Sequence, residues 1–126
     1  MNKVVTTSVF RVPAISHVVF TKASHTYYVS TQLGVDVAGK LVGDGIVEQT
    51  AKALQNLEAV LTDVGVPVKS IVKVSVFLTS LDHWKEVRGL LDTFFDGHEP
   101  ARDIPIITPM SLTGALVGFS AIAVGI

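Results

Sequence analysis

Apolar side chains recur along this chain with two different periods, one typical of helices and one typical of strands. From about residue 46 to residue 64 they return every three or four positions, which predicts an amphipathic helix. The same spacing recurs from about residue 83 to residue 96. The two apolar stripes consist of Val47, Ala51, Leu54, Leu57, Leu61 and Val64, and of Trp84, Val87, Leu90, Leu91, Phe94 and Phe95.

Residues at the ends of both stretches are typical of helix boundaries. Asp44 and Asp82 precede the stripes, and each carboxylate is predicted to cap a helix by accepting hydrogen bonds from unpaired backbone N–H groups. Gly65 and Gly97 follow the stripes, where a left-handed backbone commonly ends a helix.

The middle of the chain also contains strand patterns. Residues 18–33 are predicted to form two strands around a turn at residues 23–25, because β-branched and aromatic residues dominate both arms. Residues 34–45 contain four glycines and are predicted as a loop. Residues 70–78 alternate between two sets of side chains, which indicates a mostly buried strand.

Strands are also predicted near both ends of the chain, at residues 3–7, 101–108 and 115–124. Pro105 and Pro109 limit the strand at 101–108 to the edge of a sheet or to a bulge, because proline has no backbone N–H to donate. The apolar C-terminal stretch is 16 residues long and contains glycines. A membrane-spanning helix needs about 20 residues, so a strand buried on both faces is the better interpretation.

The resulting order of elements is β-β-β-α-β-α-β-β. This order predicts one α+β domain over residues 1–126, with both helices on one face of a mixed sheet.

Composition adds an expectation about assembly. Charged residues make up 17% of the chain and hydrophobic residues 48%, whereas an average soluble domain has about 25% charged residues. A monomer of this size would leave much apolar surface in water, so we expect subunits to cover one another. The net charge of −1 disfavours nucleic-acid binding. The absence of cysteine excludes disulfides and thiolate metal sites.

The four histidines do not suggest a metal site, since no two are spaced to chelate an ion from one helix face. We expect structural roles for His25, His83 and His98, the last because a cation suits the C-terminal end of a helix. His17 stays open as a candidate for chemistry.

Two short stretches carry other candidate site residues, each with two interpretations. Ser30, Thr31 and Gln32 end a predicted strand, where they either line a pocket or bond the local backbone. Arg102 lies after Pro100 and before an apolar run. Its planar guanidinium either binds a carboxylate through two parallel hydrogen bonds or pairs with the adjacent Asp103.

The order and spacing of several motifs resemble the reactive-intermediate deaminase (RidA, formerly YjgF) family, from about Pro13 to Val124. The motifs are STQ at 30–32, ALQNLEAVL at 53–61, VKVSVFL at 72–78 and PAR at 100–102. The resemblance implies a chorismate-mutase-like fold and a homotrimer, in which three sheets form a central barrel and sites lie between subunits. It also implies a small carboxylate-bearing imine or enamine substrate, no cofactor, and Arg102 as the group that binds the carboxylate.

The site differs from the family pattern in several places. Ser120 stands where the family commonly has a glutamate thought to orient the attacking water. Thr31 replaces a glycine, His17 lies one residue from the place of a missing tyrosine, and Asp103 follows the PAR motif where a small residue is common. The predicted catalytic residues are therefore Arg102, Ser120 and His17. The predicted substrate-binding residues are Arg102, Ser30, Thr31, Gln32 and Asp103.

These observations predict a cytoplasmic deaminase that hydrolyses imines or enamines to 2-keto acids and ammonia, with no nucleic-acid or membrane partner. Two alternatives stay open. One is a protein of this fold that catalyses another small-molecule reaction, as an isomerase, cyclase or hydratase, and the other is a non-catalytic binder of small acids. An endoribonuclease or translation inhibitor, an activity of some relatives, is disfavoured by the net charge of −1.

Overall fold

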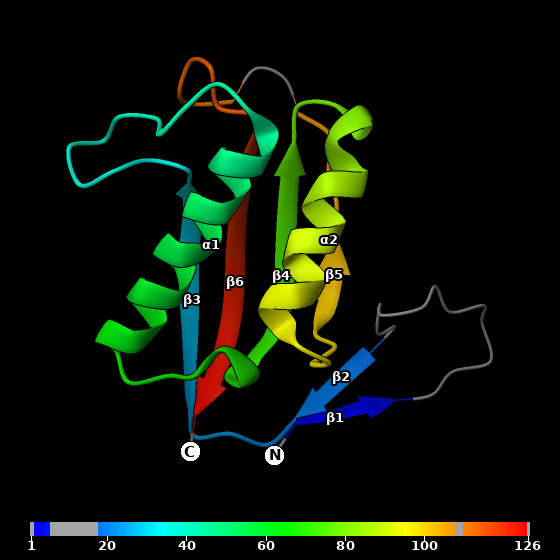
Figure 1. Ribbon diagram of the computed structural model, residues 1–126. Coiled ribbons are helices and arrows are strands. Elements are labelled where there is room, and N and C mark those ends of the chain that lie inside the picture. The colour runs from blue at the N-terminus through cyan, green and yellow to red at the C-terminus, as the bar shows by residue number, and fades with distance from the viewer. Residues whose placement is uncertain (1, 6–17, 108–109, 126) are drawn as a thin grey trace.

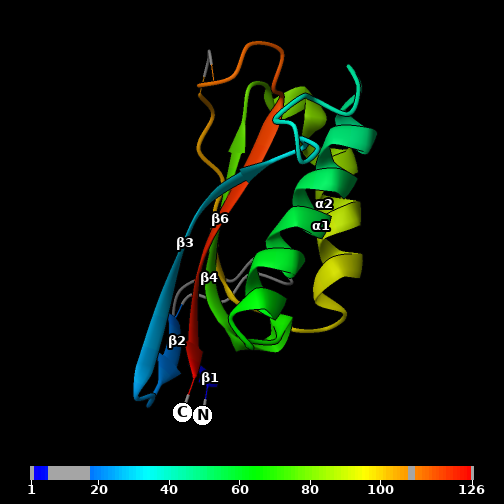
Figure 2. The ribbon, with the colours of Figure 1, turned by 90° about the vertical axis from the view of Figure 1, so that its left-hand side faces the viewer.

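Two helices lie side by side on one face of a four-stranded sheet in the computed structural model, which describes residues 2–5, 18–107 and 110–125 (Figures 1 and 2). The order of elements along the chain is the one predicted from the sequence. The strands are β1 (Asn2–Val5), β2 (Val18–Thr21), β3 (His25–Leu33), β4 (Ile71–Leu78), β5 (Ala101–Asp103) and β6 (Val117–Gly125). The α-helices are α1 (Ile46–Asp63) and α2 (Trp84–Phe95), and short 3-10 helices cover Val68–Ser70 and Leu81–His83.

The main sheet is mixed, as expected, with the strand order β3-β6-β4-β5. Strand β6 pairs antiparallel with β3 and with β4, whereas β4 and β5 are parallel. Strands β1 and β2 form a separate antiparallel pair in which Asn2 lies opposite Thr21. The two faces of the main sheet therefore differ, because α1 and α2 cover only one of them (Figure 2).

Alternation along β4 shows which side of the sheet is the core. Val74, Val76 and Leu78 are fully buried, while Lys73 on the opposite face is exposed. The buried set meets Leu57 of α1 in one apolar cluster. Burial of such side chains is the main favourable contribution to folding, at about 25 cal/mol per Å² of apolar surface. No described helix covers the other face of the main sheet, which is called the open face below.

The buried side of α1 differs from the stripe predicted from the sequence at both ends and also at Ala51, which is exposed. Leu54, Leu57 and Leu61 are buried as predicted, whereas Val47 is 53% and Val64 51% exposed. A helix rotates about 100° per residue, so Val47 lies about 80° around the axis from Leu57 and toward solvent. Val64 lies beyond the last helical residue. Polar Gln49 and Thr50 are buried as well, and the Gln49 side chain bonds loop backbone at the start of the helix.

Both predicted aspartate caps are wrong, although the helix ends are close to those expected. The N-cap of α1 is Gly45, whose N–H donates to Glu48 Oε1 at 2.8 Å, so a glutamate one turn on replaces Asp44 in this role. Before α2 the chain makes a 3-10 turn, where the Ser80 hydroxyl accepts from the Asp82 N–H at 3.1 Å. At the C-terminal ends, Gly65 and Gly97 have φ of +76° and +87°, as the glycine positions predict.

The strand expected at residues 101–108 is much shorter, because proline interrupts its pairing. Strand β5 covers three residues at the edge of the sheet, in agreement with the edge position predicted from the prolines. Beyond it the Leu78 N–H donates to the Pro105 carbonyl at 3.1 Å, and the Ile107 N–H donates to the Leu78 carbonyl at 2.8 Å. The last strand, β6, is central and largely buried, as expected. None of the helices in the described part of the chain is long and apolar enough to cross a bilayer.

Candidate functional site

A row of polar side chains crosses the open face of the sheet, at one level on neighbouring strands. The register places Ser120 of β6 opposite Ser75 of β4, and Ser75 next to Asp103 of β5. On the other side of β6 the pairing with β3 shifts between Val29 and Gln32, so that Ser30 and Thr31 together lie opposite Ser120. Such a shift in strand pairing changes the direction in which side chains point, and it is common next to functional sites.

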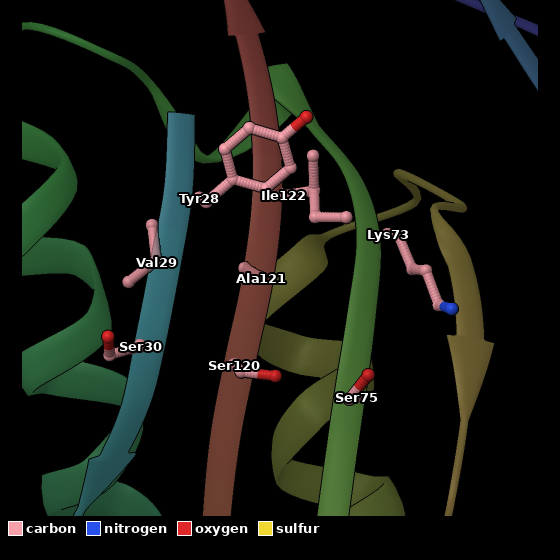
Figure 3. A pocket seen from close by; sticks show the side chains of 8 residues that line it. All are labelled: Tyr28, Val29, Ser30, Lys73, Ser75, Ser120, Ala121 and Ile122. Atoms are coloured by element: carbon pink, nitrogen blue, oxygen red, sulfur yellow. The ribbon is translucent and has the colours of Figure 1, made fainter. Parts of the chain in front are cut away.

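This row borders a shallow cavity of about 230 Å³ on the open face (Figure 3). Its lining residues are Tyr28, Val29, Ser30, Lys73, Ser75, Ser120, Ala121 and Ile122. Figure 3 shows the hydroxyls of Ser75 and Ser120 on adjacent strands, with Lys73 on the side of β5. Two predicted site residues, Ser30 and Ser120, are thus brought to one cavity.

Sequence reasoning missed Ser75 and Lys73 as members of this site. The signal for them was available, because the alternation of residues 70–78 already placed both on the face opposite Val74. What could not be read from local pattern was that β4 lies directly beside β6, which is a long-range pairing.

Thr31 and Gln32 have different surroundings within the same irregular stretch. Gln32 Nε2 donates to the Ser30 carbonyl at 3.1 Å, which is the local backbone role left open above. Thr31 lies over Gly118: a Cβ added at that glycine would come within 2.7 Å of Thr31 Cγ2. Gly118 therefore lets β3 fold closely over β6 beside the serine row.

Arg102 faces the opposite side of the sheet. It lies next to the buried Val74 in the parallel β4–β5 register, so it projects toward the helices. Its Nη2 lies 3.5 Å from Asp92 Oδ1 on α2, and its side chain is 1% exposed. Nε and Nη1 are buried and have no hydrogen-bond partner in the described structure. Burial lowers the pKa of Arg102 below its usual value, and the Asp92 carboxylate opposes this shift.

Asp103 is not the partner of Arg102. Successive strand residues point to opposite faces, and Asp103 lies on the open face with its Oδ2 3.9 Å from Lys73 Nζ. Both of these side chains are about half exposed, so the pair contributes little to stability. The alternative in which Arg102 pairs with its sequence neighbour is therefore wrong, and Asp92 takes that place.

Three of the four histidines lie among the described residues. His98 Nε2 donates to the Ile71 carbonyl at 2.6 Å and His25 Nδ1 lies 2.8 Å from Ser24 Oγ, in agreement with structural roles. His83 is the N-cap residue of α2 without a capping side-chain bond. His17 lies outside the described residues. Within residues 2–5, 18–107 and 110–125, no three His, Cys, Asp or Glu side chains gather to hold a metal ion.

The arrangement separates two kinds of chemistry. On the open face, the hydroxyls of Ser75 and Ser120 and the ammonium of Lys73 can hydrogen-bond a water molecule or a small polar ligand. On the helix side, a buried guanidinium has two donors without partners in the described structure, and an anion is the group whose oxygens would accept from them. The sheet lies between the two groups, so one chain cannot place Arg102 and Ser120 on the same small molecule.

Comparisons with known proteins relate the chain to one family. The family model described as Endoribonuclease L-PSP matches residues 11–125. A mouse protein named 2-iminobutanoate/2-iminopropanoate deaminase is 34% identical over 104 residues, which cover 82% of this chain and 76% of the relative.

Two solved structures are similar to this fold. A Rid-family protein of unknown function from Yersinia pestis has a TM-score of 0.89 at 22% identity, with 98% of each chain covered. A Thermotoga maritima protein described as a putative endoribonuclease has a TM-score of 0.76 at 33% identity, with 88% of this chain and 86% of the other covered. The arrangement of two helices on a mixed sheet is thus the fold of these proteins.

Proposed function

Because the chain belongs to the RidA (YjgF) family, whose model is described as Endoribonuclease L-PSP, we propose that it is a hydrolase of 2-imino acids. In the proposed reaction, water adds to the carbon of the C=N bond of a 2-imino acid. The resulting carbinolamine loses ammonia as its C–N bond breaks, and a 2-keto acid is left. The relationship to proteins named 2-iminobutanoate/2-iminopropanoate deaminase supports this reaction and the C–N bond as its target.

The state of Arg102 is the single observation in the structure that carries the proposal. A guanidinium that is 1% exposed and whose Nε and Nη1 find no partner in the part of the chain that the structure describes is costly, because each buried donor without an acceptor loses its hydration. A carboxylate offers two acceptor oxygens in the spacing of the guanidinium fork. We therefore assign the carboxylate of the 2-imino acid to Arg102.

We further propose that the working unit is a homotrimer whose sites lie between subunits. Arg102 and the serine row lie on opposite faces of one sheet, so a second copy has to supply one of them to each site. The open face also leaves Tyr28 79% exposed in the single chain, which a neighbouring subunit would cover. A content of 17% charged residues favours such coverage.

In this site the serine hydroxyls bind and orient rather than abstract protons. A serine is neutral near pH 7 and is a poor base without a basic partner. We assign Ser120 and Ser75 to holding the attacking water or the imine nitrogen, with Ser30 and Thr31 beside them. His17 stays a candidate for proton transfer, and Gln32 and Asp103 for shaping the site.

The alternatives are less well supported. The similarity to named deaminases does not favour a retooled isomerase, cyclase or hydratase, or a non-catalytic binder. An RNA-cleaving activity, which the family description suggests, is disfavoured by the net charge of −1, because binding to a phosphate backbone draws on an excess of cations. We propose the cytoplasm as the compartment and a reaction without a cofactor; cell fractionation tests the former.

A coupled assay tests the proposed reaction. Threonine dehydratase generates 2-iminobutanoate, and the purified protein is added while formation of 2-oxobutanoate is followed. We expect the protein to accelerate this step and the Arg102→Gln variant to lose the acceleration. Equal rates with and without the wild-type protein, at concentrations up to that of the dehydratase, would refute the proposal.

A further inference from the structure

Arg102 and Asp92 meet where the edge strand β5 packs against α2. Asp92 lies near the end of α2, with its side chain 42% exposed, and its Oδ1 is 3.5 Å from Arg102 Nη2. Its other oxygen is 3.8 Å from Arg88 Nε, one turn earlier on the same helix. Asp92 is therefore shared between a surface arginine and a buried one.

The buried arginine cannot reach a ligand in this arrangement. Its side chain is 1% exposed, and the two unpartnered donors, Nε and Nη1, are both buried. A carboxylate arriving from solvent finds Asp92 on the exposed side of the pair. To gain two hydrogen bonds, the guanidinium has to turn away from Asp92 toward the edge of the sheet. Strand β5 is the edge strand, so no further strand among residues 2–5, 18–107 and 110–125 blocks this direction.

We propose that Asp92 is an internal competitor for Arg102, and that the substrate carboxylate binds by taking its place. This inference rests on the proposed function, because it assumes that Arg102 binds the substrate. The Asp92 carboxylate and the substrate carboxylate are chemically equivalent. The exchange therefore replaces one charge-assisted pair by another and leaves no buried cation without a partner. Asp92 then sets how weakly the site binds monocarboxylates and how readily the product leaves.

The size of the effect follows from a population argument. If the open form of Arg102 makes up ~10% of molecules, the apparent Kd is ~10-fold weaker than that of an always-open site. Removing the charge of Asp92 should recover most of this factor. Removing the charge of Arg88 should have the opposite effect, because Asp92 would then have Arg102 as its main partner.

Calorimetric titration with 2-oxobutanoate, the product of the proposed reaction, tests this inference. We expect Asp92→Asn to lower the Kd about 5- to 10-fold and Arg88→Gln to raise it about 2-fold. Glu86→Gln is the matched control, because Glu86 is an exposed acid in the first turn of the same helix. It should leave the Kd unchanged.

The outcomes separate this inference from the proposed function. A Kd in Asp92→Asn that is unchanged or higher overturns the competitor role and leaves Arg102 as the carboxylate site. Wild-type binding in Arg102→Gln overturns the proposed site itself. The gain from Asp92→Asn should vanish in the Arg102→Gln background, since it acts through Arg102. If thermal unfolding shows that Asp92→Asn does not fold, Arg88→Gln decides: weaker binding supports the inference and unchanged binding overturns it.

Discussion

For the single residue Arg102, the alternation of side chains along β5 decides which face of the sheet surrounds it. Its neighbours Ala101 and Asp103 lie toward the open face, while Arg102 itself is turned toward the buried Val74 and α2. The result is a guanidinium that is 1% exposed in an edge strand. Two of its donors, Nε and Nη1, are buried without an acceptor among the described residues, which costs free energy.

Replacing Arg102 by lysine should weaken carboxylate binding, because an ammonium cannot form two parallel hydrogen bonds with one carboxylate. We expect a loss of about 1.5–3 kcal/mol, or roughly 10- to 150-fold in Kd, for 2-oxobutanoate measured by calorimetry. Arg88→Lys makes the same chemical change at a 42% exposed side chain and should have a small effect. Unchanged affinity in Arg102→Lys would mean that Arg102 has a purely structural role.

Ser120 is the second residue with a testable consequence. The family resemblance places a water-orienting glutamate at this position, and general acid–base assistance is typically worth about 10²–10⁴-fold. We expect slow hydrolysis of 2-iminobutanoate by the wild-type protein, relative to a family member that keeps the glutamate. Ser120→Glu should recover part of the difference, because Ser120 borders an open cavity of about 230 Å³.

The same coupled assay measures this recovery. Ser111→Glu adds an equal charge at an exposed loop position outside the cavity and should change nothing. If the wild-type protein already matches the glutamate-bearing relative, another group, such as His17 or the Ser75–Ser120 pair, orients the water.

At the scale of elements, Gln49 joins the start of α1 to two separate loops. Its Nε2 donates to the carbonyls of Gly43 and Gly114 at 2.9 and 3.0 Å, and its Oε1 accepts from the Leu116 N–H at 2.8 Å. The side chain is fully buried. The loop that follows β3 also approaches closely: a Cβ on Gly34 would lie 2.5 Å from the Gln49 carbonyl oxygen. Gln49 thus fixes the helix relative to the segment that leads into β6.

Gln49→Ala should lower the free energy of unfolding by about 1–3 kcal/mol, because it removes a fully buried side chain and leaves two carbonyls and one N–H without partners at a partly buried place. Urea unfolding at one fixed protein concentration measures the change. Gln55→Ala removes the same side chain from an exposed position of α1 and should shift stability by less than about 0.5 kcal/mol. A loss in Gln49→Ala no larger than in Gln55→Ala would show that the three hydrogen bonds add little.

At the scale of the whole molecule, the open face of the sheet is expected to be covered by other subunits. We predict that sedimentation equilibrium gives three copies of the 13.4 kDa chain at micromolar concentration, and that dissociation accompanies unfolding. Tyr28→Glu, on the open face, should weaken the trimer. Val37→Glu, which charges an exposed loop residue, should leave it intact. A wild-type mass of 13.4 kDa would rule out the homotrimer and the shared site with it.

Net charge gives a second prediction at this scale. A protein with a charge of −1 has no excess of cations to release counterions from a phosphate backbone. We expect no measurable binding of single-stranded RNA at physiological salt by fluorescence anisotropy. Micromolar, salt-sensitive binding would reopen the endoribonuclease alternative.

The sequence by itself determined the elements of this protein and their order, because helices and strands carry their own periodicity. The apolar spacing located α1 and α2, the glycines marked their ends, and Pro105 indicated an edge strand. The motif order also indicated the family that residues 11–125 match. The resemblance predicted Ser30, within the STQ motif, and Ser120, at the place of the family glutamate, as site residues, and both line the cavity on the open face.

Only the tertiary structure decided which side chains meet, because strand neighbours come from distant parts of the chain. The pairing of β4 with β6 added Ser75 and Lys73 to the site, and the parallel pairing of β4 with β5 turned Arg102 away from it. Asp92, ten positions before Arg102, became its partner because α2 packs across β5. Register sets the face of every strand residue, and register is a property of the assembled sheet rather than of any one strand.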